Sequence, residues 1–298
     1  MAEAAASRVH LRQEAELAAA RLPPLMVAAE RVAATVQQGV HGRRRVGMGE
    51  AFWQFRRYEA GDSVRKIDWR QSAKTDKLFI RETEWAAAQS VWLWPDPSPS
   101  MQWRSKRSLP EKRDRADLIA LALSSLLVRA GERVAVLGTG ERPISGKVAL
   151  DRLAQRILFR SKPAGKLGDL PAFEPLPRYA TLIFIGDLLA PLEETDRLVR
   201  RYAAAGVRGY LFHILDPAEQ SLPYAGRTRF EGLEQEGHLL VKRVETVRDE
   251  YKAKMAEHQA GLADIARAVG WNYALHLTDQ APEAALLRLY VNLAQLPG

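Results

Sequence analysis

Four side chains that carry oxygen atoms come directly after two apolar segments of the kind that forms buried strands. Asp96, Ser98 and Ser100 follow the first segment, two residues apart, and Asp187 follows the second. Residues at i, i+2 and i+4 of an extended loop point the same way, and oxygen ligands are the ones that Mg²⁺ prefers. The pattern predicts a site for Mg²⁺, or for Mn²⁺, with Ser98 and Ser100 as direct ligands and both aspartates binding directly or through water.

Such a site suits binding rather than catalysis. Few carboxylates touch the ion, so it keeps positive charge and an open coordination position that fits an Asp or Glu of a partner. The alternative is a structural role, because Asp, Ser and Pro are ordinary turn residues and Asp187 could cap a helix that begins near Pro191.

Alternating strands and helices position these residues. The expected strands are 90–94, 134–137, 182–185, 207–214 and 273–277, and the expected helices are 110–130, 149–160, 191–205, 245–269 and 282–294. A capping box formed by Ser108 and Glu111 opens the first of these helices. This alternation predicts an α/β fold with a doubly wound, mostly parallel sheet. With the strand order 3-2-1-4-5-6 and the segment 182–185 taken as the fourth strand of that order, Asp96 and Asp187 would meet where the order reverses, which is where ligands bind in such sheets.

Three regions differ in pattern. Residues 1–41 are expected to form N-terminal helices, residues 42–87 a small extended subdomain, and residues 88–298 the α/β domain. A hairpin or irregular insertion is expected over 228–244. The helix over 245–269 should pack one amphipathic face on the domain, and the residues expected to point inward are Val247, Tyr251, Met255, Leu262, Ile265 and Val269.

Composition excludes several classes of protein. The chain has 298 residues, 47% hydrophobic and 27% charged, and no cysteine. These values are those of a globular protein and exclude a disulfide framework, a thiolate metal site and a cysteine nucleophile. No apolar run reaches the roughly 20 residues that cross a bilayer, and none has the form of a signal peptide. We therefore expect no membrane span and a cytoplasmic location.

Positive charge is concentrated in one segment. Residues 41–81 hold 11 Lys and Arg against 5 Asp and Glu, which accounts for +6 of the net charge of +8. Aromatic residues lie among these arginines, a mixture that single-strand nucleic-acid binders also show. We expect the aromatic residues to belong to a core, so nucleic-acid binding is the less favoured interpretation.

The same region carries a family resemblance. Residues 47–74 closely resemble the signature of the domain of unknown function 58 family, and the matching residues include Arg56, Tyr58, Gly61, Asp62, Arg65, Asp68 and Trp69. We expect these residues to form a structural network, with Trp69 and Phe52 as anchors and arginine–aspartate pairs around them. The alternative is an exposed docking surface.

The resemblance implies more about fold and partners. In that family the signature precedes a von Willebrand factor A-like domain, whose metal-ion-dependent adhesion site begins Asp-x-Ser-x-Ser, as Asp96, Ser98 and Ser100 do here. Family members are associated with MoxR-type AAA+ ATPases. The resemblance thus implies an adaptor that acts with such an ATPase on a client protein that the sequence leaves unidentified.

Enzymatic alternatives have less support in the sequence. The segment around Gly146 and Lys147 lacks the spacing of a phosphate-binding loop, and the six histidines lack metal-ligand spacing. A magnesium-dependent phosphohydrolase or nuclease that uses Asp96 and Asp187 remains an alternative, although no general base is evident. We therefore expect the chain not to be an enzyme.

Overall fold

A five-stranded parallel sheet forms the centre of the protein in a computed structural model, which describes residues 26–37, 52–58, 67, 69–74, 77–83, 90–159, 170–233 and 237–295. The strand order is β4-β3-β5-β6-β9, and every neighbouring pair is parallel. The strands are β3 (Ser90–Pro95), β4 (Arg133–Val136), β5 (Thr181–Gly186), β6 (Arg208–Leu215) and β9 (Asn272–Leu277). The expected α/β fold with a mostly parallel sheet is confirmed.

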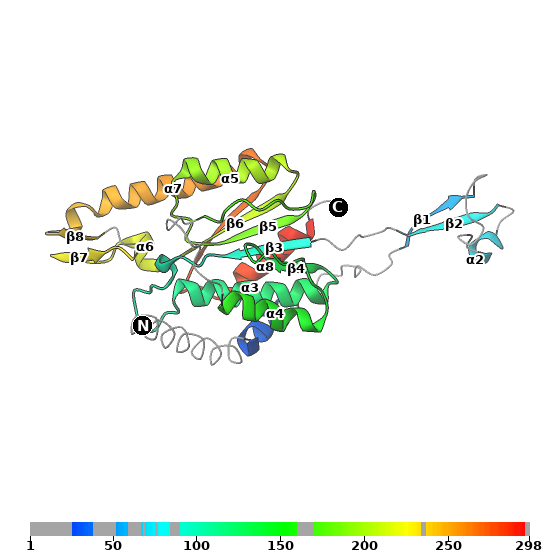
Figure 1. Cartoon of the computed structure of the whole chain (residues 1–298), viewed down its shortest axis with the longest axis horizontal. Coiled ribbons are helices and arrows are strands. Elements are labelled where there is room, and N and C mark those ends of the chain that lie inside the picture. Colours follow the sequence, from blue (N-terminus) through cyan, green and yellow to red (C-terminus); the bar gives the residue numbers. More distant parts are fainter. Residues whose placement is uncertain are drawn as a thin grey trace, which may run out of the picture.

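Helices cover both faces of this sheet (Figure 1). One face packs against α3 (Lys112–Arg129), α4 (Lys147–Leu158) and α8 (Pro282–Gln295), and the other against α5 (Leu192–Ala204) and α7 (Arg248–Ala268). The short α6 (Pro217–Ser221) and the 3₁₀ turns η2 (Pro99–Met101) and η3 (Val244–Thr246) lie in the connections. Strands buried on both faces explain why their sequences are almost continuously apolar.

The expected strand order was wrong. Numbered along the sheet-forming strands, the order is 2-1-3-4-5, because the chain places β4 on one side of β3 and then crosses to β5 on the other side. The reversal still lies between β3 and β5. Asp96 and Asp187 follow these two strands directly, so both aspartates lie at the carboxyl end of the sheet.

Aromatic side chains fill the layer between the sheet and the α5–α7 face. Phe184 stacks on Trp271 with ring centroids 6.1 Å apart and meets Trp94 edge-on at 5.7 Å. The Trp271 ring lies so close to Gly209 of β6 that a Cβ there would be 2.2 Å from the ring. Gly209 is therefore needed for the close approach of the ring to the strand.

An N-terminal helix over residues 26–37 joins the core on the opposite face. Ala29, Val32 and Val36 are buried there, as their helical spacing indicated. Glu30 accepts a hydrogen bond from Ser125 of α3 at 2.8 Å. The described part of the N-terminal region is thus integrated with the α/β domain.

Two details of the helices differ from expectation. Ser108 does not cap α3, which begins at Lys112 after Glu111 and has no side-chain cap; instead the Trp103 carbonyl accepts the Lys112 backbone N–H at 3.2 Å. In α7 only Leu262 of the expected inward residues is fully buried, together with Ala266. Of the half-buried ones, Ile265 and Val269 pack against the core as expected. Val247, Tyr251 and Met255 lie at or in the first half of α7, which extends beyond the sheet toward the β7–β8 hairpin (Figure 1).

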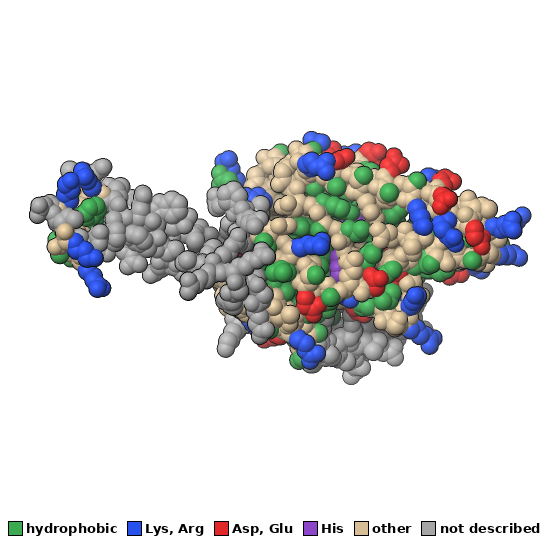
Figure 2. Space-filling view, turned by 180° about the vertical axis from the view of Figure 1, so that it is seen from behind, with side chains coloured by type: hydrophobic (Ala, Val, Ile, Leu, Met, Phe, Trp, Pro, Cys, Tyr) green, Lys and Arg blue, Asp and Glu red, His purple; other side chains and the backbone are tan. Residues whose placement is uncertain are grey.

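Two small antiparallel pairs lie outside the main sheet. One, formed by β7 (Thr228–Glu231) and β8 (His238–Val241), is the expected hairpin. Its Leu239 and Leu240 are exposed, and Figure 2 shows several Lys and Arg side chains at this end of the molecule. The other pair, β1 (Phe52–Arg57) and β2 (Phe79–Thr83), forms a unit with the short α2 (Trp69–Ser72).

Candidate functional site

Asp96 is fixed at the end of β3 by the neighbouring strand. Its backbone N–H donates to the Ile185 carbonyl of β5 at 2.9 Å, and its side chain is completely buried. The carboxylate lies against Gly186, where an added Cβ would be 2.6 Å from the Asp96 Cβ. Asp96 Oδ1 accepts the Ser98 backbone N–H at 2.7 Å. The aspartate therefore shapes the loop that carries the two serines.

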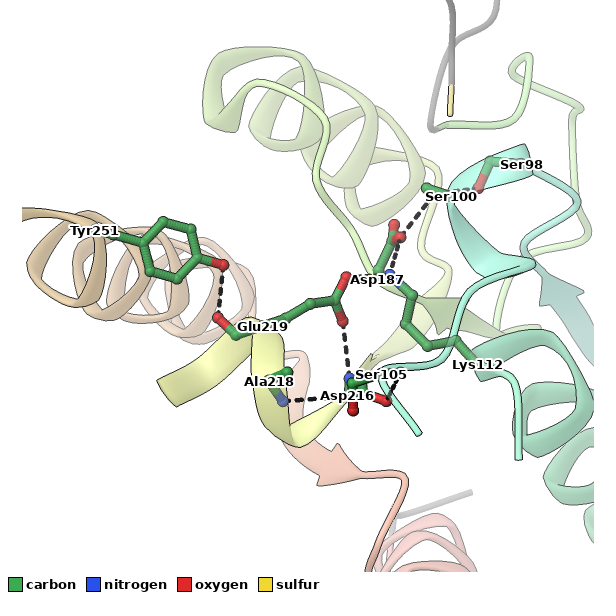
Figure 3. A network of polar contacts seen from close by, with 9 residues as sticks. All are labelled: Ser98, Ser100, Ser105, Lys112, Asp187, Asp216, Ala218, Glu219 and Tyr251. Carbon is green, nitrogen blue, oxygen red and sulfur yellow. Dashed lines mark hydrogen bonds and ion pairs between the residues drawn. The ribbon is translucent and has the colours of Figure 1, made fainter. Parts of the chain in front are cut away.

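The serines link this loop to β5. Ser98 and Ser100 share a hydrogen bond between their hydroxyls at 2.9 Å, and the Ser100 hydroxyl donates to Asp187 Oδ2 at 2.7 Å (Figure 3). Asp187 follows β5 and is completely buried. It does not cap α5, whose N-cap residue is Pro191. The structure thus brings all four residues of the expected metal site to one end of the sheet, whereas their role as metal ligands stays a prediction.

A buried lysine lies in the same place. Lys112, the first residue of α3, is 1% exposed, and its Nζ donates to Asp187 Oδ2 at 2.8 Å and to Glu219 Oε1 at 2.5 Å. Burial alone lowers the pKa of Lys112, but the charges of Asp187 and Glu219 and the hydrogen bonds to them outweigh burial and raise this pKa above its usual value. The ammonium therefore stays charged.

Sequence reasoning missed this lysine, although a signal existed. A cation in the first turn of a helix is opposed by the helix dipole, and Lys112 is the first residue of the helix that follows the two serines. A lysine there needs acidic partners from elsewhere in the chain. Glu219 belongs to α6, a helix too short to be expected from periodicity.

The network continues from Glu219 to α7. Asp216 caps α6 and accepts the Ala218 N–H at 2.8 Å, while Glu219 accepts the Asp216 N–H at 2.8 Å, which completes a capping box. The Tyr251 hydroxyl of α7 donates to the Glu219 carbonyl at 2.6 Å (Figure 3). Asp216 also accepts the Ser105 N–H at 2.9 Å. One polar network therefore joins η2, α3, α6 and α7.

This arrangement does not fit the expected divalent ion. A metal bound to Asp187 Oδ2 at about 2.1 Å would lie at most about 4.9 Å from Lys112 Nζ, because Nζ is itself 2.8 Å from that oxygen. Repulsion between +2 and +1 at that separation is about 7 kcal/mol at an effective dielectric constant of about 20. Among the described residues no group of three or more His, Cys, Asp or Glu side chains is placed to hold a metal. Lys112 already supplies the positive charge.

A basic loop lies beside this network. Arg104, Lys106 and Arg107 are exposed and form no ion pair with any described residue. Ser105 anchors the loop by donating its N–H to Asp216 at 2.9 Å, and a turn in which the Leu109 N–H donates to the Lys106 carbonyl at 3.0 Å shapes the rest of it. The carboxyl end of the sheet therefore presents three cations on an anchored loop.

The signature residues are only partly described. Gly61, Asp62, Arg65 and Asp68 lie outside the described residues, as does the Arg56 side chain, so the expected arginine–aspartate network stays a prediction. Tyr58 is half-buried, and its N–H donates to the Leu78 carbonyl at 2.9 Å. Trp69 is 61% exposed. Its expected role as a buried anchor is wrong, because in α2 its side chain faces outward.

Relatives in the curated proteins share much of this chain. The uncharacterized protein Rv1480 of Mycobacterium tuberculosis and the uncharacterized protein Mb1516 of Mycobacterium bovis are each 27% identical to it over 236 residues. The match covers 75% of this chain and 73% of either relative.

Similar solved structures include the conserved hypothetical protein BatB from Bacteroides thetaiotaomicron (15% identity, TM-score 0.40) and an aerotolerance-related membrane protein from Bacteroides fragilis (14% identity, TM-score 0.43). Each match covers 70% of this chain and 100% of that structure. The second of these and an uncharacterized membrane-spanning protein from Vibrio fischeri (14% identity, TM-score 0.20, 70% of this chain and 98% of that one) are named as membrane proteins. The cytoplasmic location expected above is withdrawn as a correction. None of the described helices has the length and apolar character needed to cross a membrane.

A family model extends over most of the sheet domain and part of the signature. The model described as "Protein of unknown function DUF58" matches residues 54–261, which include Asp96, Lys112, Asp187 and Glu219. Because this match covers more than half of the chain, the chain belongs to the DUF58 family.

Proposed function

We propose that this protein is a non-enzymatic interaction module that binds an acidic segment of a partner protein at the carboxyl end of its sheet. The observation that carries the proposal is the anchored loop with Arg104, Lys106 and Arg107, three exposed cations without ion pairs among the described residues. Complementary charge of this kind speeds association and selects among partners. The domain that carries the loop is, on this proposal, of the von Willebrand factor A-like type.

The chemistry of the network supports binding over catalysis. Lys112 cannot accept a proton while its ammonium stays charged between Asp187 and Glu219. The Ser100 hydroxyl donates to Asp187 Oδ2, and the same oxygen also accepts the Lys112 ammonium, so this oxygen is already engaged by two donors. The group that would activate a nucleophile in a phosphohydrolase is therefore not supplied by these residues.

The partner is proposed from the family resemblance. A MoxR-type AAA+ ATPase and a client protein would meet this chain, with the basic loop contacting acidic residues of one of them. The expected metal is left out of the proposed contact, since the Lys112 ammonium already lies beside Asp187. Arginine and lysine side chains bind a carboxylate directly.

A charge-reversal experiment tests this proposal. The variant R104E/K106E/R107E is compared with R152E/R197E/K252E, which reverses three exposed cations on α4, α5 and α7. We measure binding of a purified MoxR-type AAA+ ATPase from the same organism by biolayer interferometry, and binding of a fluorescein-labelled oligoglutamate peptide by anisotropy. We expect the loop variant to lose at least tenfold in affinity for both, and the control to change less than threefold.

Three results would contradict the proposal. Equal binding by the loop variant and the control would remove the loop from the contact. Turnover of a generic phosphodiester with Mg²⁺ by wild type, lost in D96A, would favour the hydrolase alternative. Retention of wild type on single-stranded DNA, but not on the ATPase or the peptide, would favour nucleic-acid binding.

A further inference from the structure

A single carboxylate oxygen at the carboxyl end of the sheet accepts two hydrogen bonds, one from a hydroxyl and one from an ammonium group. Asp187 Oδ2 receives the Ser100 hydroxyl at 2.7 Å and the Lys112 ammonium at 2.8 Å. Ser100 belongs to the Asp-x-Ser-x-Ser run and Lys112 to the helix that follows it. The serine pair and the ammonium therefore converge on one atom from the same stretch of chain.

The ammonium is enclosed by carboxylates rather than by water. Lys112 is 1% exposed and Asp187 is completely buried. The second partner is Glu219, whose Oε1 accepts a hydrogen bond from Lys112 Nζ at 2.5 Å (Figure 3). A buried lysine is normally avoided unless it is paired. Here two carboxylates from α6 and from the end of β5 supply the pairing.

The backbone around Lys112 keeps the ammonium in this position. The Lys112 N–H donates to the Trp103 carbonyl at 3.2 Å, and Ser105 between them is tied to Asp216 at 2.9 Å. The loop that carries the exposed cations is therefore anchored through the same acidic group of residues. Removing the ammonium would leave Asp187 and Glu219 without a counter-charge.

We propose that the Lys112 ammonium takes permanently the place that a divalent cation has in an adhesion-type site, so that this site assembles and holds its loop without metal. Loss of the ammonium would then uncover a latent site for a divalent cation between Asp187 and the two serines. This proposal concerns the assembly of the site and does not depend on which partner binds the loop.

Metal titration of the full-length chain tests the proposal. MnCl₂ is titrated calorimetrically into wild type, K112M, K112R and K112M/D187N, and thermal unfolding is followed with MnCl₂ and with EDTA. We expect wild type and K112R to bind no Mn²⁺ and to unfold at the same temperature in both solutions. We expect K112M to bind one Mn²⁺ and to unfold at a higher temperature with MnCl₂ than with EDTA, and K112M/D187N to lose both responses.

Two outcomes overturn the proposal. One is one-to-one Mn²⁺ binding by wild type that raises its unfolding temperature, because the ammonium would then coexist with the metal. The other is a folded K112M that shows no Mn²⁺ response, because the acidic group would then be no latent cation site. If K112M does not fold, the wild-type titration decides alone, since no Mn²⁺ binding supports the proposal and one-to-one binding overturns it. Partner binding enters neither readout, so a failure here is distinct from a failure of the proposed function.

Discussion

Replacing Lys112 by methionine tests how much the buried ammonium contributes to stability. Methionine keeps a similar length of side chain but removes two charge-assisted hydrogen bonds, to Asp187 at 2.8 Å and to Glu219 at 2.5 Å. It leaves the completely buried Asp187 carboxylate without its counter-charge. Removing one member of a buried ion pair costs about 3–5 kcal/mol. For a domain of this size that loss lowers the unfolding temperature by roughly 6–20 °C.

Urea denaturation followed by circular dichroism measures this loss. The matched control is K106M, an exposed lysine of the basic loop, which we expect to change the free energy of unfolding by no more than about 0.5 kcal/mol. The double variant K112M/D187N removes both charges, and we expect it to be more stable than K112M by at least about 1 kcal/mol. A loss below about 1 kcal/mol in K112M would refute the reasoning, because the ammonium would then not be compensating buried carboxylates.

Three further predictions concern the sheet. Gly186→Ala should push Asp96 aside, because the new Cβ would lie 2.6 Å from the Asp96 Cβ, and we expect a loss of about 1–3 kcal/mol by urea denaturation. Gly209→Ala should cost at least as much, because its Cβ would lie 2.2 Å from the Trp271 ring. Burial lowers the pKa of His276 to about 4, below the value of about 6.5 in the unfolded chain. His276 should therefore contribute a loss of stability of up to about 1.4 kcal/mol per pH unit as pH drops from about 6.5 toward about 4, and His276→Phe should remove this contribution to the slope; an unchanged slope would contradict the assignment.

Sequence periodicity predicted the elements of the α/β domain well because strands buried on both faces leave a strong signal. The apolar run at 90–94 became β3 and the run at 182–185 became β5, each within one residue at either end. Side-chain pattern, however, carries little information on which strand lies beside which. The order 2-1-3-4-5 depends on the packing of crossover helices on opposite faces, which no single segment encodes.

The candidate site was predictable only in part for a similar reason. Asp96 and Asp187 were found because residues that follow neighbouring parallel strands share one end of the sheet. Lys112 and Glu219 come from the start of a helix and from a five-residue helix, and the pairing between them is set by tertiary packing. The cation at the centre of the site is therefore a lysine that the sequence pattern did not single out.

In the signature segment, a side chain that was expected to be buried is exposed. Trp69 was expected to be an anchor because large aromatic side chains usually bury much of their surface. In the short helix α2 its side chain is 61% exposed. A family signature identifies a segment without saying which of its side chains pack and which face outward.

The most direct measurement is the anomalous diffraction of a crystal of the wild-type protein soaked in MnCl₂. We predict no manganese peak among Ser98, Ser100 and Asp187, and electron density for the Lys112 Nζ within hydrogen-bonding distance of Asp187 and Glu219. A manganese peak coordinated by the two serine hydroxyls, with the lysine turned away from Asp187, would contradict the assignment of Lys112 as the cation of this site.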